Sequence, residues 1–133
     1  MLSFVDERPV RSSEDVVTIR QAVRQRAVDL GFSLVDQTKL VTAASELARN
    51  LVQHAGGGVV KVEIIAEGPR RGLRLVFEDK GPGIPDLELA MRDGYSTDGG
   101  LGLGLSGARR LSNEFAIDST PGQGTRVTIA RWK

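Results

Sequence analysis

The spacing of the hydrophobic residues changes at the glycine run Gly56-Gly57-Gly58. Before the run, hydrophobic residues recur every three or four positions, which predicts helices. After the run, they mostly alternate with polar residues, which predicts strands joined by short loops. Because hairpins pair antiparallel strands, this order favours helices packed against a sheet over a doubly wound parallel sheet.

Two helices are predicted before the glycine run. The first begins at Ser12 or Ser13 and ends at Gly31, because serine caps helix starts and glycine ends helices. The second follows the capping residue Ser33 and extends over about 34–55. The predicted hydrophobic faces consist of Val16, Ile19, Val23, Ala27 and Leu30 in the first helix, and Leu40, Ala44, Leu47 and Leu51 in the second.

The second part of the chain predicts two hairpins and a third helix. One hairpin crosses the loop Gly68–Gly72 and the other crosses the turn Pro121–Gly124. Between them lies a segment rich in Gly, Pro and Asp over 80–100, with a short helical piece near 86–92, and then a helix over 103–111.

These elements predict an α+β fold. We expect a two-layer sandwich in which a mixed, mostly antiparallel sheet carries about three helices on one face. The first ten residues are weakly patterned and are consistent with a short edge strand. A chain of 133 residues suits one core, so residues 1–133 are predicted to form a single domain.

Composition excludes several functional classes. The chain has no Cys, so it has no disulfide framework and no Cys-based zinc site. A formal net charge of +1 gives no reason to expect nucleic acid or an anionic membrane surface as a partner. The sequence shows no membrane-spanning stretch and no apolar leader, so we expect a cytoplasmic protein.

Glycine is concentrated in one segment: eight of the sixteen glycines lie between Gly81 and Gly107. The run Gly100–Leu105 leads directly into the third predicted helix, and such loops bring backbone N–H groups close to phosphates. A surface loop with no ligand is the alternative. The chain contains no Gly-Lys pair, which excludes a Walker loop, and the G-x-G-x-x-G letters at 102–107 follow a loop instead of a strand.

Polar residues accompany this glycine segment. Glu46 and Asn50 are four positions apart, so they are neighbours on one face of the second predicted helix, away from its hydrophobic stripe. A carboxylate can accept a proton and an amide oxygen can bind Mg²⁺, although a solvated helix face explains the same pattern. Asp79 and Thr125 share the inward parity of their strands, where Asp79 either binds an adenine amino group or caps the following turn.

Taken together, four motifs resemble the ATP-binding boxes of the family shared by gyrase, Hsp90, histidine kinases and MutL. Within that family, the chain from about Ser12 onward resembles the small bacterial anti-sigma-type serine/threonine kinases of the RsbT-like group. The motifs are Glu46-x-x-x-Asn50, Asp79-x-Gly81-x-Gly83-Ile84, Gly100-Leu101-Gly102-Leu103-Gly104-Leu105 and Gly124-Thr125, to which the segment Asp93–Gly102 adds a glycine lid over ATP.

The resemblance implies a role for each matching residue. It makes Glu46 the general base, Asn50 the Mg²⁺ ligand, and Asp79 the residue that reads adenine. Arg49 approaches the phosphates or is only exposed, and His54 touches a phosphate or serves local structure. The other implied ATP contacts are Gly81 and Gly83 beneath the base, Ile84 on adenine, the phosphate-binding residues Gly100, Gly102, Leu103, Gly104 and Leu105, and Thr125 through water.

The resemblance also implies partners. It implies a kinase of a bacterial partner-switching stress response, which uses ATP and Mg²⁺ to phosphorylate a STAS-domain protein and, once released, activates a PP2C-type phosphatase. An anti-sigma factor of the same fold, which captures a sigma factor directly, is the first alternative. A detached histidine-kinase catalytic domain is the second.

Overall fold

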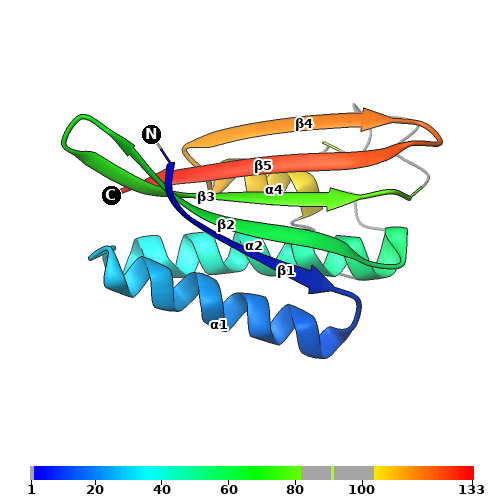
Figure 1. Ribbon diagram of the computed structural model, residues 1–133, viewed down its shortest axis with the longest axis horizontal. Helices are drawn as coiled ribbons and strands as arrows, with labels where there is room; N and C mark the ends of the chain where they lie inside the picture. The colour runs from blue at the N-terminus through cyan, green and yellow to red at the C-terminus, as the bar shows by residue number, and fades with distance from the viewer. Residues whose placement is uncertain (1, 82–90, 92–103) are drawn as a thin grey trace.

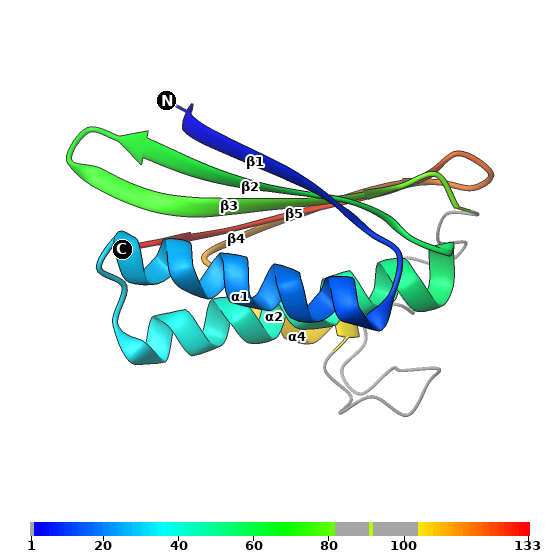
Figure 2. The ribbon, with the colours of Figure 1, turned by 60° about the horizontal axis from the view of Figure 1, so that its bottom comes forward.

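The computed structural model describes residues 2–81, 91 and 104–133. Two layers make up this part of the chain: a five-stranded sheet, and helices packed against one of its faces (Figures 1 and 2). The α+β sandwich predicted from the sequence is confirmed. The expected helical piece near 86–92 and the segment 93–103 lie outside the described residues, apart from Met91.

The two long helices begin at the capping residues that the sequence predicts, and α2 ends at its predicted glycine, whereas the C-cap of α1 is Leu30, one residue before the predicted Gly31. Ser12 caps α1, where its side chain accepts from the N–H of Asp15, and Ser33 caps α2 in the same way. Gly56 ends α2 in the left-handed conformation, with φ 73°. No helix in the described ranges is long and apolar enough to cross a membrane. The helices are α1 (Ser13–Asp29), α2 (Leu34–Ala55) and α4 (Gly104–Arg110).

The sheet has the strand order β1-β2-β3-β5-β4. All four described pairings are antiparallel, so the expectation of a mixed sheet is wrong in this detail. The N-terminal segment forms an edge strand, as its weak pattern suggested. The strands are β1 (Leu2–Val10), β2 (Gly58–Glu67), β3 (Arg70–Asp79), β4 (Glu114–Thr120) and β5 (Gly124–Trp132).

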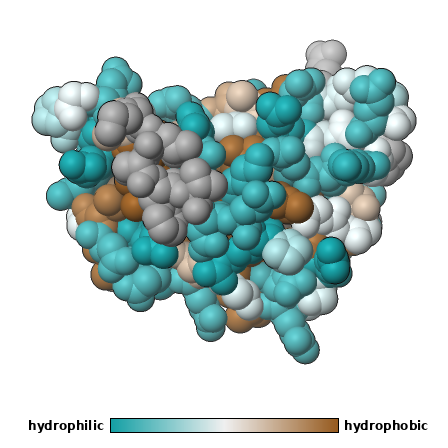
Figure 3. Space-filling model, viewed as in Figure 1, coloured by the Kyte–Doolittle hydropathy of each residue, from teal (hydrophilic) through white to brown (hydrophobic). Residues whose placement is uncertain are grey.

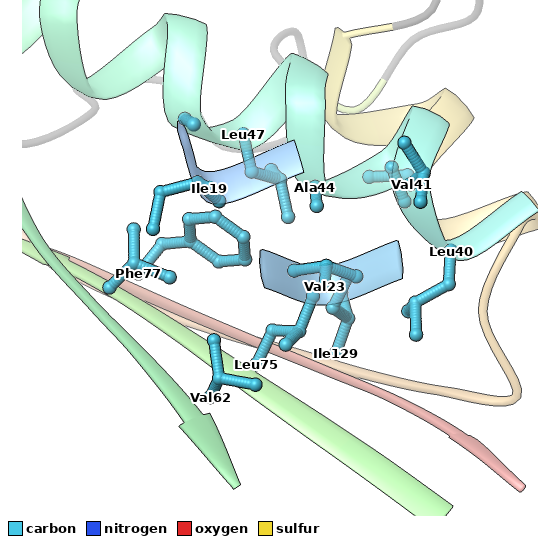
Figure 4. Packing of buried hydrophobic residues seen from close by; sticks show 14 of the residues in the cluster. Ile19, Val23, Leu40, Val41, Ala44, Leu47, Val62, Leu75, Phe77 and Ile129 are labelled. Atoms are coloured by element: carbon cyan, nitrogen blue, oxygen red, sulfur yellow. The ribbon is translucent and has the colours of Figure 1, made fainter. Parts of the chain in front are cut away.

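The core lies between the sheet and the two long helices. In Figure 4, Phe77 and Leu75 of β3 point toward Leu47 of α2 and toward the side chains of α1. The predicted hydrophobic faces are buried, except that Leu30 is only half-buried. Burial of each large side chain stabilises the fold by about 1.5–3 kcal/mol, so this shared core fixes α2 against the sheet.

The other face of the sheet carries no helix from the described part of the chain, and hydrophilic residues predominate on it (Figure 3). Glu63 and Ile65 lie on this face, where alternation predicts exposure, yet both are buried. Arg74 of the neighbouring strand covers Glu63 and donates to its carboxylate. The two residues are paired across the strands. Glu63 therefore contacts Arg74 where the alternating pattern predicted contact with water.

An ion pair ties the end of the chain to the start of α2. The guanidinium of Arg131 donates to Oδ1 of Asp36 from Nη2 at 2.9 Å and to the carbonyl of Leu111 from Nη1 at 2.8 Å. Arg131 thus joins β5 to the first turn of α2 and to the residue that follows α4. The hydrogen bond from Arg131 is the main reason that the pKa of Asp36 is lowered from its usual 3.8.

Replacement of this carboxylate should therefore have a pH-dependent effect. A lowered folded-state pKa contributes stability above pH 3.8, which is lost as the pH falls through the folded-state pKa. We expect Asp36→Asn to reduce the free energy of unfolding by about 1 kcal/mol at pH 7 and by less at acidic pH. Urea unfolding across this range measures the difference, with exposed Glu67→Gln as the control. An undiminished effect of Asp36→Asn at low pH would contradict this assignment.

Candidate functional site

Glu46 and Asn50 lie one helical turn apart on α2. Glu46 does not lie on a fully solvated helix face, because only 8% of this residue is exposed. Asn50 is half-buried. Oε1 of Glu46 accepts a hydrogen bond from Nη1 of Arg49 at 3.0 Å. A buried carboxylate with one cationic partner and a nearby amide therefore forms a polar site on the helix.

Asp79 ends β3 on the face that the helices cover, as its parity predicts. Its Oδ1 accepts the N–H of Gly81 at 2.8 Å, so this carboxylate caps the turn after the strand. The turn lies against the last residue of α2, because a Cβ on Gly81 would meet the Cβ of Ala55 at 3.0 Å. No described residue donates a hydrogen bond to Oδ2 of Asp79. Capping the turn therefore leaves one carboxylate oxygen for another partner.

Thr125 lies directly opposite Asp79 in the pairing of β3 with β5. On its other side it pairs with Ser119 of β4, and the two hydroxyl oxygens are 2.8 Å apart. Sequence reasoning missed Ser119. Its signal was present, since Ser119 shares the parity of Phe115 and Ile117 in β4. A row of three polar side chains thus crosses the end of the sheet.

The main chains of β3 and β5 come very close beside this row. Gly124 has φ 122°, and a Cβ on it would lie 2.1 Å from the carbonyl oxygen of Asp79. No other residue fits there without displacing backbone. A polar hollow of about 200 Å³ opens at this end of the sheet. It is lined by Glu78, Asp79, Asp118, Thr120, Gln123, Gly124, Thr125 and Arg126.

Gly104 and Leu105, the last two residues of the predicted phosphate-binding run, begin α4. Leu105 is buried, and α4 packs along α2 (Figure 1). The remaining predicted site residues lie outside the described residues; they are Gly83, Ile84, Gly100, Gly102 and Leu103.

The described site residues thus meet around α2. Glu46 and Asn50 lie on the helix, the turn after Asp79 contacts its C-terminal end, and α4 flanks it. His54 is exposed in the last turn of α2. Within the described ranges, no group of three or more His, Cys, Asp or Glu side chains could hold a metal ion.

Comparison with known proteins assigns the class. The profile of the histidine kinase-, DNA gyrase B- and HSP90-like ATPases matches residues 35–133. The chain is 48% identical to the serine/threonine-protein kinase RsbT of Bacillus subtilis over 118 residues, which cover 89% of each protein. The chain therefore belongs to this ATPase family and, within it, to the RsbT-like protein serine/threonine kinases.

A further relative and two solved structures are also similar to this chain. The chain is 31% identical to the anti-sigma F factor of Pasteuria penetrans over 127 residues, covering 90% of this chain and 83% of that protein. A crystal structure of RsbU and RsbW domains from Mycobacterium tuberculosis matches with a TM-score of 0.68 at 20% identity, over 98% of this chain and 33% of that one. The mycobacterial sensor histidine kinase MprB matches with a TM-score of 0.56 at 21% identity, over 96% of this chain and 97% of that one. The two structures support the fold alone.

The close approach of Gly124 to the carbonyl of Asp79 predicts that a larger residue at position 124 destabilises the fold. We expect Gly124→Ala to lower the free energy of unfolding by about 2 kcal/mol more than Gly122→Ala, because its methyl group would displace the end of β3. Gly122 is a matched control: it also has positive φ, 79°, but a Cβ there meets nothing within 4 Å. Urea unfolding of both variants measures the difference. Equal losses would show that backbone strain, and not the contact with Asp79, requires glycine at position 124.

Proposed function

We propose that this chain transfers the γ-phosphoryl group of ATP to a serine or threonine of a STAS-domain regulator. One structural observation carries the proposed catalytic site: the buried carboxylate of Glu46, one turn from Asn50 on the helix that the Asp79 turn and α4 both contact. The 48% identity to a serine/threonine-protein kinase supports a protein hydroxyl as the acceptor.

In this proposal Glu46 is the general base. The acceptor hydroxyl oxygen forms a bond to the γ-phosphorus while the bond from that phosphorus to the bridging oxygen breaks. ADP leaves with the electron pair, and Glu46 takes the hydroxyl proton. Because the protein itself does little covalent chemistry in this step, its main role is to position ATP and the acceptor hydroxyl.

The adenine end of the proposed site lies at the end of β3, beside the start of β5. Asp79 uses Oδ1 for its own turn, which leaves Oδ2 to accept the adenine amino group. Thr125 lies opposite and is bonded to Ser119, so its hydroxyl can reach the base through water. We assign the turn beneath the base to Gly81 with Gly83 and Ile84, and the phosphate contacts to Gly100, Gly102, Leu103, Gly104 and Leu105.

The donor set suits magnesium as a companion of ATP. Mg²⁺ prefers oxygen ligands, and it is commonly bound by one or two protein groups together with substrate phosphates. We assign the Asn50 side-chain oxygen as the protein ligand, since Asn50 lies one turn from Glu46 on α2. When bound, Mg²⁺ would neutralise charge on the phosphates.

The proposal includes a second partner. After release from its phosphorylated substrate, the kinase would bind and activate a PP2C-type phosphatase. Direct capture of a sigma factor is the alternative, which the identity to anti-sigma F factors favours. We assign all of these activities to residues 1–133 acting as one domain.

The first experiment combines the purified protein with Mg-ATP and a panel of STAS-domain proteins. We expect acid-stable phosphate on serine or threonine of one of them. Acid-labile phosphate would point to histidine and to the histidine-kinase alternative. A pull-down with sigma factors tests the other candidate, and absence of transfer despite bound ATP would count against the kinase proposal.

Two substitutions separate binding from chemistry. Asp79→Asn retains an oxygen to cap the turn but can present an N–H to the adenine amino group, so we expect the Kd for ATP to rise about 10- to 100-fold. Glu46→Gln removes the proton acceptor, so transfer should fall about 100-fold or more while ATP still binds. Calorimetric titration and single-turnover transfer measure the two effects. Near-normal transfer by Glu46→Gln would remove Glu46 from the role of base.

A further inference from the structure

An arginine one turn away holds the proposed catalytic base. Nη1 of Arg49 donates to Oε1 of Glu46 at 3.0 Å, within α2. No described residue donates a hydrogen bond to Oε2 of Glu46. We propose that Arg49 is a positioning residue for phosphoryl transfer: it orients the Glu46 carboxylate through one oxygen, so that the other oxygen accepts the hydroxyl proton. This inference rests on the proposed function.

The hydrogen bond from Arg49 matters because the carboxylate that accepts it is buried. Glu46 is one of three buried polar or charged residues in the described ranges. Its neighbours along the helix include buried Leu47 and Ala43, which offer a carboxylate no hydrogen bond. A carboxylate removed from water needs a donor in place of the lost water, and Arg49 supplies that hydrogen bond.

The geometry suits Arg49 to this role. The Arg49 side chain is 41% exposed while that of Glu46 is 10% exposed, so the guanidinium approaches the carboxylate from the solvent side. In the described structure it bonds to one oxygen only, which restrains rotation of the carboxyl group without occupying both of its oxygens. A lysine in the same place could supply the charge but not the planar donor group.

Two other roles for Arg49 make different predictions. As a purely structural ion pair, it would affect stability and leave transfer unchanged per folded molecule. As a direct phosphate ligand, it would act on ATP affinity and would not depend on Glu46. In the positioning role, Arg49 affects the transfer rate, and only while Glu46 is present.

The chain contains a matched control pair. Among the described residues, Arg74 and Glu63 form a second ion pair with a buried glutamate, and their side chains are 40% and 10% exposed. This pair lies on the sheet face opposite the described helices, away from α2. Arg74→Met therefore removes an equivalent guanidinium from an equally buried carboxylate outside the proposed site.

The test is a set of single-turnover transfer assays with radiolabelled ATP and the STAS-domain acceptor found above. We expect Arg49→Met to lower the transfer rate about 10- to 100-fold, while the Kd for ATP changes less than about threefold. Arg49→Lys should restore part of the rate. Arg74→Met should reduce thermal stability to a similar extent and retain the wild-type transfer rate.

A double-mutant cycle then connects Arg49 to Glu46. In a Glu46→Gln protein, adding Arg49→Met should cause no further loss, because the arginine acts through the carboxylate. Equal losses in both backgrounds, or a rise in the Kd for ATP that accounts for the lost activity, would overturn the inference. So would a normal rate for Arg49→Met when Glu46→Gln is inactive, an outcome that leaves the proposed function intact. An active Glu46→Gln protein would instead refute the base assignment and, with it, this inference.

Discussion

The packing of α2 against the sheet is the constraint on which the rest of the structure depends. Its hydrophobic face, which includes Leu40 and Leu47, is buried against residues of β3 and β5. The adjacent face carries Glu46 and Asn50, and α4 packs along the same helix. Core packing and the candidate site therefore share one rigid element, so a core change that rotates α2 also moves the polar groups.

The helices could be predicted closely because their ends depend on local chemistry. Ser12, Ser33 and Gly56 act within one turn of themselves, and the structure uses all three as caps. The sheet was less predictable, because its details depend on partners distant in the sequence. The burial of Glu63 requires Arg74 on the next strand, and the segment 70–71 that resembles a loop is paired with β2.

In the candidate site, too, the spacing of residues within one element was predictable, but the contacts between elements were not. The spacing of Glu46 and Asn50 and the inward parity of Asp79 and Thr125 follow from helix and strand geometry, and the structure places Asp79 and Thr125 opposite each other. The two interpretations of Asp79 prove compatible, since capping its turn uses one oxygen. Periodicity does not reveal which polar groups bond to each other. The contact of Ser119 with Thr125 and the buried state of Glu46 therefore emerge only from the fold.

The contact between Gly81 and Ala55 has a further consequence for how this chain can change. Ala55 lies nine positions after Glu46 on α2, a rise of about 14 Å along a regular helix. On the proposed assignment, that stretch sets the distance between the adenine end of the site and the proton acceptor. One inserted residue would lengthen it by about 1.5 Å and turn one end by about 100° relative to the other. This segment should therefore keep its length among relatives that share the chemistry, whereas the exposed tip at Gly68 and Pro69 is free to grow.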